Sequence, residues 1–303
     1  MTTTDPSTPP TRPAPGTAGP PLGLLLARGA LFSPFKRPRA DAAHPREPVV
    51  LPGLRIDRTR LAAYERVCGF APGDDGLPVT YPHVLGFPSA MRLMSRRDFP
   101  LPLLGLVHTS IDVTRHTALP ATEPYDLAVH VEGLAAHRRG TQATVATVLR
   151  SGGQVVWESR STYLARHRTG PPAERSPSPG GGDAEEGALP VVDEWRLAGD
   201  VGRRYGAASG DRNPIHLHPL TARLFGFPRA IAHGMWTVAR CLAAHGTPEA
   251  VRVHADFRAP VLLPGTVVFA ADGDRFTLRG PGDGGRLHVS GRVERLPAPR
   301  PRA

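Results

Sequence analysis

Residues 205–244 read YGAASGDRNPIHLHPLTARLFGFPRAIAHGMWTVARCLAA, and the interpretation of the whole chain starts from them. Asp211 and His216 lie five residues apart in this stretch. The dipeptide Asn213-Pro214 between them disfavours a helix and favours a tight turn. A turn there directs a carboxylate and an imidazole into one pocket.

A helix is predicted at the end of the same stretch, starting after His233 at Gly234. Apolar residues recur at helical spacing from Met235 onward, and Gly246 stands where a glycine commonly ends a helix. The first N–H groups of such a helix have no helical acceptor and can stabilise a developing negative charge. Because the helix is apolar nearly all round, the fold must enclose it.

Strands are predicted after this helix, because alternating segments are separated by turn residues such as Pro264-Gly265. The predicted strands are 252–258, 266–272, 275–279 and 286–294.

The preceding part of the chain has the same order of elements, which indicates an internal repeat. An apolar helical run covers 81–94, and the separation of His83 from His108 resembles that of His233 from His254. The predicted strands of this half are 105–114, 125–134, 142–150 and 155–165. We therefore predict an α+β fold in which a curved antiparallel sheet wraps a central helix, twice in one chain.

Composition divides the chain into five segments. Pro-, Thr-, Gly- and Ser-rich sequence predicts a largely disordered N-terminal segment, a flexible linker and a disordered tail. Two folded repeats lie between them, each the size of a small domain. The predicted boundaries are 1–47 (disordered), 48–166 (first repeat), 167–190 (linker), 191–296 (second repeat) and 297–303 (tail).

The formal net charge of +10 does not indicate a nucleic-acid-binding protein. The positive charges are arginines scattered along the chain, with Lys36 as the only lysine, and no basic stripe is interleaved with aromatic residues. Scattered arginines suit a phosphate-bearing small molecule better.

A cytoplasmic protein is predicted from its cysteines and its N-terminus. Cys68 and Cys241 are far apart in no metal-binding or redox spacing, so buried free thiols in a reducing compartment are expected. The apolar stretch 22–32 is short, is interrupted by Arg28 and follows no basic segment. It predicts neither a secretory signal nor a membrane span.

The motifs of the second repeat resemble those of the MaoC-like (R)-specific enoyl-CoA hydratases and dehydratases in their double hot-dog form. The resemblance rests on Ser209-Gly210-Asp211, Asn213-Pro214-Ile215-His216 and Ile231-Ala232-His233-Gly234-Met235. It implies two hot-dog repeats, of which the second alone keeps the Asp-x4-His pair. It also implies reversible hydration of trans-2-enoyl thioesters to (3R)-3-hydroxyacyl thioesters, carried on CoA or an acyl-carrier protein, without a metal or other cofactor.

Hydration of an enoyl thioester needs a group that activates water and a proton source, followed by stabilisation of an enolate-like oxygen. We assign Asp211 and His216 to the proton transfers and leave open which of them activates the water. The N–H of Gly234 is the predicted oxyanion donor, because a residue without Cβ allows close approach. By the resemblance, Asn213 orients the loop or contacts substrate. Phe257 and Arg258 are weaker matches to substrate-contacting positions.

One residue departs from the family pattern. His218 precedes Pro219 where an acidic or amide residue is common, which raises the alternative of a metal site with Asp211 and His216. We expect His218 instead to cap the helix begun by Pro219 and to face solvent. We also expect His233 to be structural.

Two other functions stay open at this point. The degenerate first repeat is consistent with a non-catalytic thioester-binding or scaffold subunit, and a hot-dog thioesterase would use the same helix start. The first repeat is expected to shape the acyl pocket, with Met91, Met94 and Trp157 in the core. A monomer containing an internal pseudo-dimer, or a homodimer, is expected.

Overall fold

The computed structural model describes residues 29, 33, 36–168 and 189–297. The predicted disordered N-terminus, linker and tail therefore fall largely outside the described residues. Within the N-terminal segment, the Lys36 ammonium donates a hydrogen bond to the carbonyl of Arg96 at 2.9 Å. Lys36 thus contacts the folded body.

Each half of the chain contains one five-stranded set and its own helices. The first half comprises β1 (Val49–Leu54), α2 (Arg58–Cys68), α3 (Tyr81–Met94), β2 (Leu106–Arg115), β3 (Tyr125–His137), β4 (Gly140–Ser151) and β5 (Gln154–Arg166). The second half comprises β6 (Val191–Leu197), α4 (Val201–Ser209), α5 (Pro214–Leu217), α6 (Pro219–Leu224), α7 (Gly234–His245), β7 (Val251–Phe257), β8 (Gly265–Asp272), β9 (Arg275–Arg279) and β10 (Leu287–Arg295).

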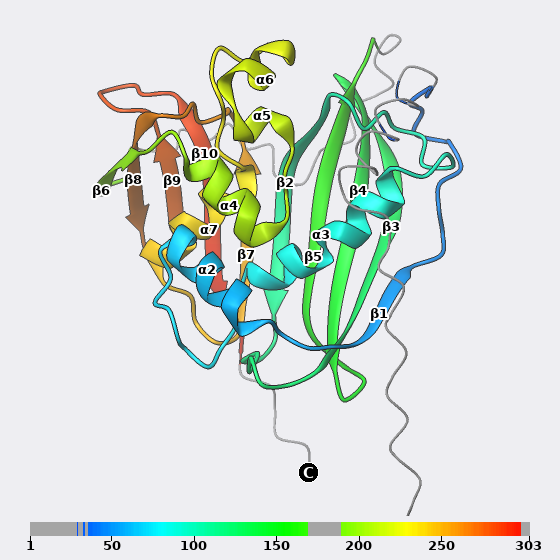
Figure 1. Cartoon of the computed structure of the whole chain (residues 1–303), viewed down its shortest axis with the longest axis horizontal. Coiled ribbons are helices and arrows are strands. Elements are labelled where there is room, and N and C mark those ends of the chain that lie inside the picture. Colours follow the sequence, from blue (N-terminus) through cyan, green and yellow to red (C-terminus); the bar gives the residue numbers. More distant parts are fainter. Residues whose placement is uncertain (1–28, 30–32, 34–35, 169–188, 298–303) are drawn as a thin grey trace, which may run out of the picture.

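The ten strands form one antiparallel sheet with the order β1-β3-β4-β5-β2-β7-β10-β9-β8-β6 (Figure 1). The last five strands have the same order as the first five, read in the reverse direction, as expected for a duplicated unit. The two halves join where β2 pairs with β7, with Val113 opposite Val253. The internal repeat is thus confirmed, and its two sheets are continuous.

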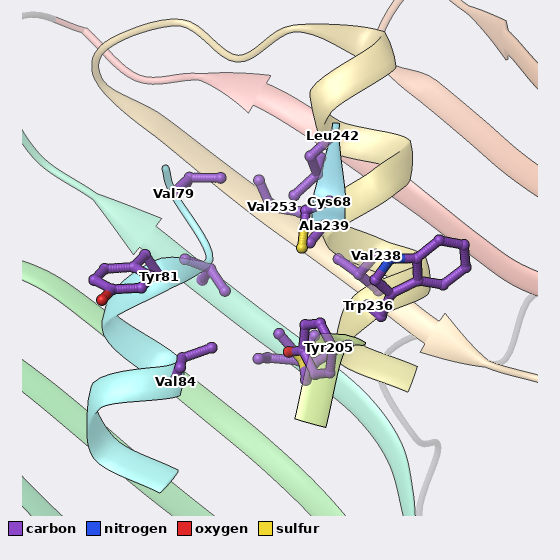
Figure 2. Packing of buried hydrophobic residues seen from close by; sticks show 14 of the residues in the cluster. Cys68, Val79, Tyr81, Val84, Tyr205, Trp236, Val238, Ala239, Leu242 and Val253 are labelled. Carbon is purple, nitrogen blue, oxygen red and sulfur yellow. The ribbon is translucent and has the colours of Figure 1, made fainter. Parts of the chain in front are cut away.

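The curved sheet surrounds α3 and α7, whose side chains form a shared core (Figure 2). In α7, Trp236, Val238 and Leu242 are all buried, as the apolar sequence of this helix requires. The indole N–H of Trp236 donates to the carbonyl of Val67 in α2 at 2.8 Å, so the core also links the two halves. The sheet and the paired helices hold the start of α7 in a fixed position.

The expected core residues and thiols are confirmed. Buried side chains include Met91, Met94 and Trp157, and both Cys68 and Cys241 are buried and unpaired. The predicted strands agree with the observed ones to within about three residues at each end.

Each half begins with two elements that the sequence analysis did not predict. A strand and a helix come first in each half, β1 and α2 in one and β6 and α4 in the other. Both strands lie at edges of the sheet. Edge strands bury few side chains, and Pro52-Gly53 inside β1 argues against a strand, so neither strand had a clear sequence pattern.

Among the described helices, none has the length and apolar character that a membrane crossing requires.

Candidate active site

The Asp211 loop is held against α4 by glycines. The helix ends at Gly210, which adopts a left-handed φ of 84° that favours glycine. A Cβ at Gly206 would lie 2.8 Å from the carbonyl oxygen of Asp211, and one at Gly202 would lie 2.0 Å from that of His216. Only glycine at 202 and 206 permits this close approach of the loop.

The Asp211 carboxylate is positioned by the backbone that follows it. Its Oδ1 accepts a hydrogen bond from the N–H of Asn213 at 3.1 Å. The Asn213 side chain in turn accepts from the N–H of Ile215 at the start of α5. Burial raises the pKa of the Asp211 carboxyl, although His216 and the Asn213 N–H oppose the rise. Asn213 therefore orders the loop.

His216 is buried in α5 with a defined tautomer. Its Nδ1 lies 2.8 Å from the carbonyl oxygen of Ile231, and a carbonyl can only accept, so Nδ1 carries the proton. Burial lowers the pKa of the imidazole, with the Asp211 charge and the Ile231 contact opposing. The neutral ring therefore has its Nε2 lone pair available to exchange a proton.

His233, immediately before α7, serves as a support for the loop. Its Nε2–H donates to the carbonyl oxygen of Asp211 at 2.9 Å, and its ring stacks on that of His216 at 3.7 Å between centroids. Burial, reinforced by His216, lowers its pKa well below the usual value, which keeps the ring neutral. These contacts agree with the expected structural role.

The side chains of Asp211, His216 and His233 offer ligand atoms within 4.8 Å of one another. The Nε2 of His233 donates its proton to a carbonyl oxygen, so it has no lone pair for an ion in this arrangement. His218, the other histidine considered as a ligand, is exposed and accepts from the N–H of Leu220 at 3.2 Å. It caps α6, as expected.

Gly234 brings the start of α7 against Phe257 at the end of β7. A Cβ on Gly234 would lie 2.9 Å from a ring carbon of Phe257. The first backbone hydrogen bond of α7 runs from the N–H of Thr237 to the carbonyl of His233. The N–H groups of residues 234–236 therefore have no acceptor within the helix. The structure therefore brings Gly234 and Phe257 together next to the His233 support.

Arg258 does not join this cluster. Its guanidinium pairs with Asp256 at 3.0 Å, and Asp256 lies on the face of β7 opposite to that of Phe257. The predicted substrate contact by its side chain is therefore not supported by its placement.

The first repeat supplies three aromatic side chains that were not predicted for the site. The His108 ring packs on Phe257 and Tyr163, with centroid distances of 4.7 and 4.6 Å, and is parallel to His83 at 6.0 Å. Burial raises the pKa of Tyr163, and the Asp211 charge adds to the rise. Burial lowers the pKa of His83 to about 4 and that of His108 to about 3. The His83–His108 spacing was visible in the sequence, whereas Tyr163 gave no signal there.

The chain resembles known proteins in sequence over most of its length. It is 38% identical over 258 residues to the 3-hydroxyacyl-thioester dehydratase X of Mycobacterium tuberculosis, a match that spans 84% of this chain and 90% of that protein. A family described as the MaoC like domain matches residues 193–274.

Solved structures agree with this similarity. A crystal structure of HtdX from Mycobacterium tuberculosis superimposes with a TM-score of 0.71 at 35% identity, over 82% of this chain and 100% of that one. A MaoC-like dehydratase from Phytophthora capsici, 17% identical, has the same fold with a TM-score of 0.66 over 86% of this chain and 100% of that one. The fold is a double hot dog, and the chain belongs to the family of MaoC-like dehydratases.

Proposed function

We propose that this protein is a hydro-lyase that interconverts (3R)-3-hydroxyacyl and trans-2-enoyl thioesters. The observation that carries the proposal is the meeting of the Asp211 carboxylate and the neutral His216 imidazole next to the free N–H groups at the start of α7. The similarity to a 3-hydroxyacyl-thioester dehydratase supports the same reaction.

In the hydration direction, Asp211 and His216 hold one water molecule against Cβ of the enoyl group. The water oxygen bonds to Cβ, one water proton passes to the pair, and the pair returns a proton to Cα. The electron pair of the C=C bond moves onto the thioester oxygen and then forms the new C–H bond. Dehydration is the reverse, so the reaction has no net oxidation.

The enolate-like oxygen requires donors that are already in place. We assign this role to the N–H of Gly234, because it is unpaired at the start of α7 and directly follows His233, whose ring stacks on that of His216. The Nδ1–H of His216 is held by the Ile231 carbonyl, so only Nε2 exchanges protons.

The substrate carrier is CoA or an acyl-carrier protein. We also propose that the protein works in the cytoplasm, which is consistent with two buried, unpaired thiols. Asn213 acts by ordering the Asp211 loop, and Phe257 forms one wall near Gly234.

The test is the loss of enoyl absorbance when crotonyl-CoA and longer trans-2-enoyl-CoA thioesters are hydrated. Asp211→Asn and His216→Ala are each expected to lower kcat by about 10²–10⁴, because each removes a positioned proton-transfer group. His218→Asn is the matched control, since asparagine also caps a helix and His218 is exposed.

Equal rates in the wild type and in both site variants would contradict the assignment of Asp211 and His216. Binding of enoyl-CoA without turnover at any chain length would favour a scaffold subunit. Release of free thiol from a saturated acyl-CoA would favour a thioesterase.

A further inference from the structure

An exposed apolar cluster lies on α6, the short helix that follows the His216 helix. Leu220 and Leu224 occupy neighbouring positions one turn apart and are 62% and 84% exposed, and Phe225 at the end of the helix is 45% exposed. Single exposed apolar residues are common, but three adjacent ones on six or seven residues indicate a contact surface. We name Leu220, Leu224 and Phe225 the α6 patch.

The α6 patch is rigidly attached to the candidate active site. Thr221 Oγ1 donates to the carbonyl of Pro214 at 2.6 Å, and Ala222, on the opposite side of α6, is fully buried. The two helices stand together at one end of the molecule in Figure 1. Three Cα steps join His216 to the start of α6, and the helix adds about 8 Å, so the Cα atoms of His216 and Leu224 lie within about 19 Å of each other. An extended phosphopantetheine arm spans such a distance.

The segment that carries the patch is strongly basic. Residues 201–230 contain one acidic residue, Asp211, and five arginines. Of these arginines only Arg204 forms an ion pair among the described residues, with Asp200 at 3.2 Å. Three of the others donate to neutral backbone carbonyls at most, which leaves their charge uncompensated: Arg203, Arg223 and Arg229. Arg212, next to Asp211, is exposed.

We propose that the α6 patch and the surrounding arginines form a docking surface for an acidic acyl-carrier protein that delivers the thioester to Asp211 and His216. The inference rests on the proposed function and names the substrate carrier. Apolar side chains ringed by positive charge suit a protein with an acidic surface and an apolar contact, because desolvated anchors supply affinity and rim charges steer association.

Other occupants fit the α6 patch less well. The nucleotide of CoA can use the arginines but gives no reason for exposed leucines on a helix. In a symmetric contact between two copies of the chain, arginines would face arginines. A membrane-surface helix needs a longer apolar face than α6 provides.

The experiment compares one trans-2-enoyl group on three carriers: a bacterial type II acyl-carrier protein, CoA and pantetheine. The variants are Leu224→Ser with Phe225→Ser, and Arg203→Glu with Arg223→Glu. Each pair is expected to lower kcat/KM for the carrier-protein substrate about tenfold or more, while the CoA and pantetheine substrates stay within about twofold. Matched controls are Val192→Ser on β6 and Arg252→Glu on β7, both exposed and far along the chain from α6.

Equal losses on all three carriers, or no loss on any, would overturn the docking surface. A change of oligomeric state in the serine pair, measured by light scattering, would assign the patch to a second copy instead. Loss of binding to anionic vesicles in the serine pair would assign the patch to a lipid surface.

If wild-type protein hydrates none of the three substrates, the proposed function fails. Fluorescence anisotropy of labelled holo-carrier protein then still tests the docking without turnover.

Discussion

Gly234 meets two requirements at one position. Without a Cβ, it leaves the first N–H groups of α7 accessible, and it also leaves room for the ring of Phe257, which a Cβ would approach to 2.9 Å. A residue with φ in the ordinary helical range does not need to be glycine for backbone reasons, so packing explains the choice here.

Gly234→Ala is expected to destabilise the protein by about 1–3 kcal/mol, because the added methyl group overpacks against Phe257. Adding Phe257→Leu removes the ring edge, so the double variant is expected to be more stable than Gly234→Ala alone. Urea unfolding measures both differences. Gly133→Ala is the control, since a Cβ there meets no atom within 4 Å. A double variant that is less stable than the single one would contradict this account.

The helices show how one half of the chain holds the active loop of the other. Arg60 of α2 donates to the carbonyls of Ala208 and Ser209 at 2.8 and 2.6 Å, at the end of α4. The last carbonyls of a helix lack helical partners, and a positive charge is favourable there. This contact fixes the end of α4 just before Asp211.

Arg60→Ala is expected to lower kcat about tenfold with a smaller change in KM, because Asp211 loses the support of α4 and a small misplacement is costly. Steady-state kinetics on crotonyl-CoA measure the two constants. Arg58→Ala is the control from the same helix, since Arg58 is exposed and pairs with the exposed Asp75 at 3.5 Å. Unchanged kcat in Arg60→Ala would show that α4 holds the loop without α2.

The sequence predicted the elements far better than their assembly. The range of α7 and its ending at Gly246 follow from apolar spacing and one glycine, which are local properties. The contact of Arg60 in α2 with the end of α4 joins residues almost 150 positions apart, and no local sequence pattern predicts it. The contact of Tyr163 with His108 likewise joins residues that are distant in the sequence.

At the scale of the whole molecule, the two halves meet along β2 and β7. His254 lies directly opposite Asp112 in this pairing, with Nδ1 at 2.8 Å from the carboxylate, and its Nε2 lies 3.6 Å from Asp256. The hydrogen bond to Asp112 and the nearby Asp256 carboxylate raise the pKa of His254 to about 10, although burial opposes the rise. The seam between the repeats therefore carries a charged histidine between two carboxylates.

Because the pKa of His254 is raised on folding, its contribution to stability is fully present below about pH 6.5 and is lost as the pH rises toward 10. His254→Gln is expected to lower the melting temperature at pH 6 and to differ much less from wild type at pH 10. Thermal melts across this range measure the difference, with His218→Asn, which keeps the cap of α6, as the exposed control. A constant difference between His254→Gln and wild type at all pH values would contradict a charge effect.

The sequence by itself determined the repeated α+β elements, the enclosed helix α7, and the turn that joins Asp211 to His216, because spacing between near neighbours sets these features. The tertiary structure alone decided that the two sheets are continuous through β2 and β7, that Arg258 turns away from Phe257, and that His108 and Tyr163 reach the site. These outcomes depend on strand register and on packing between residues distant in the chain, where many arrangements share the same local pattern.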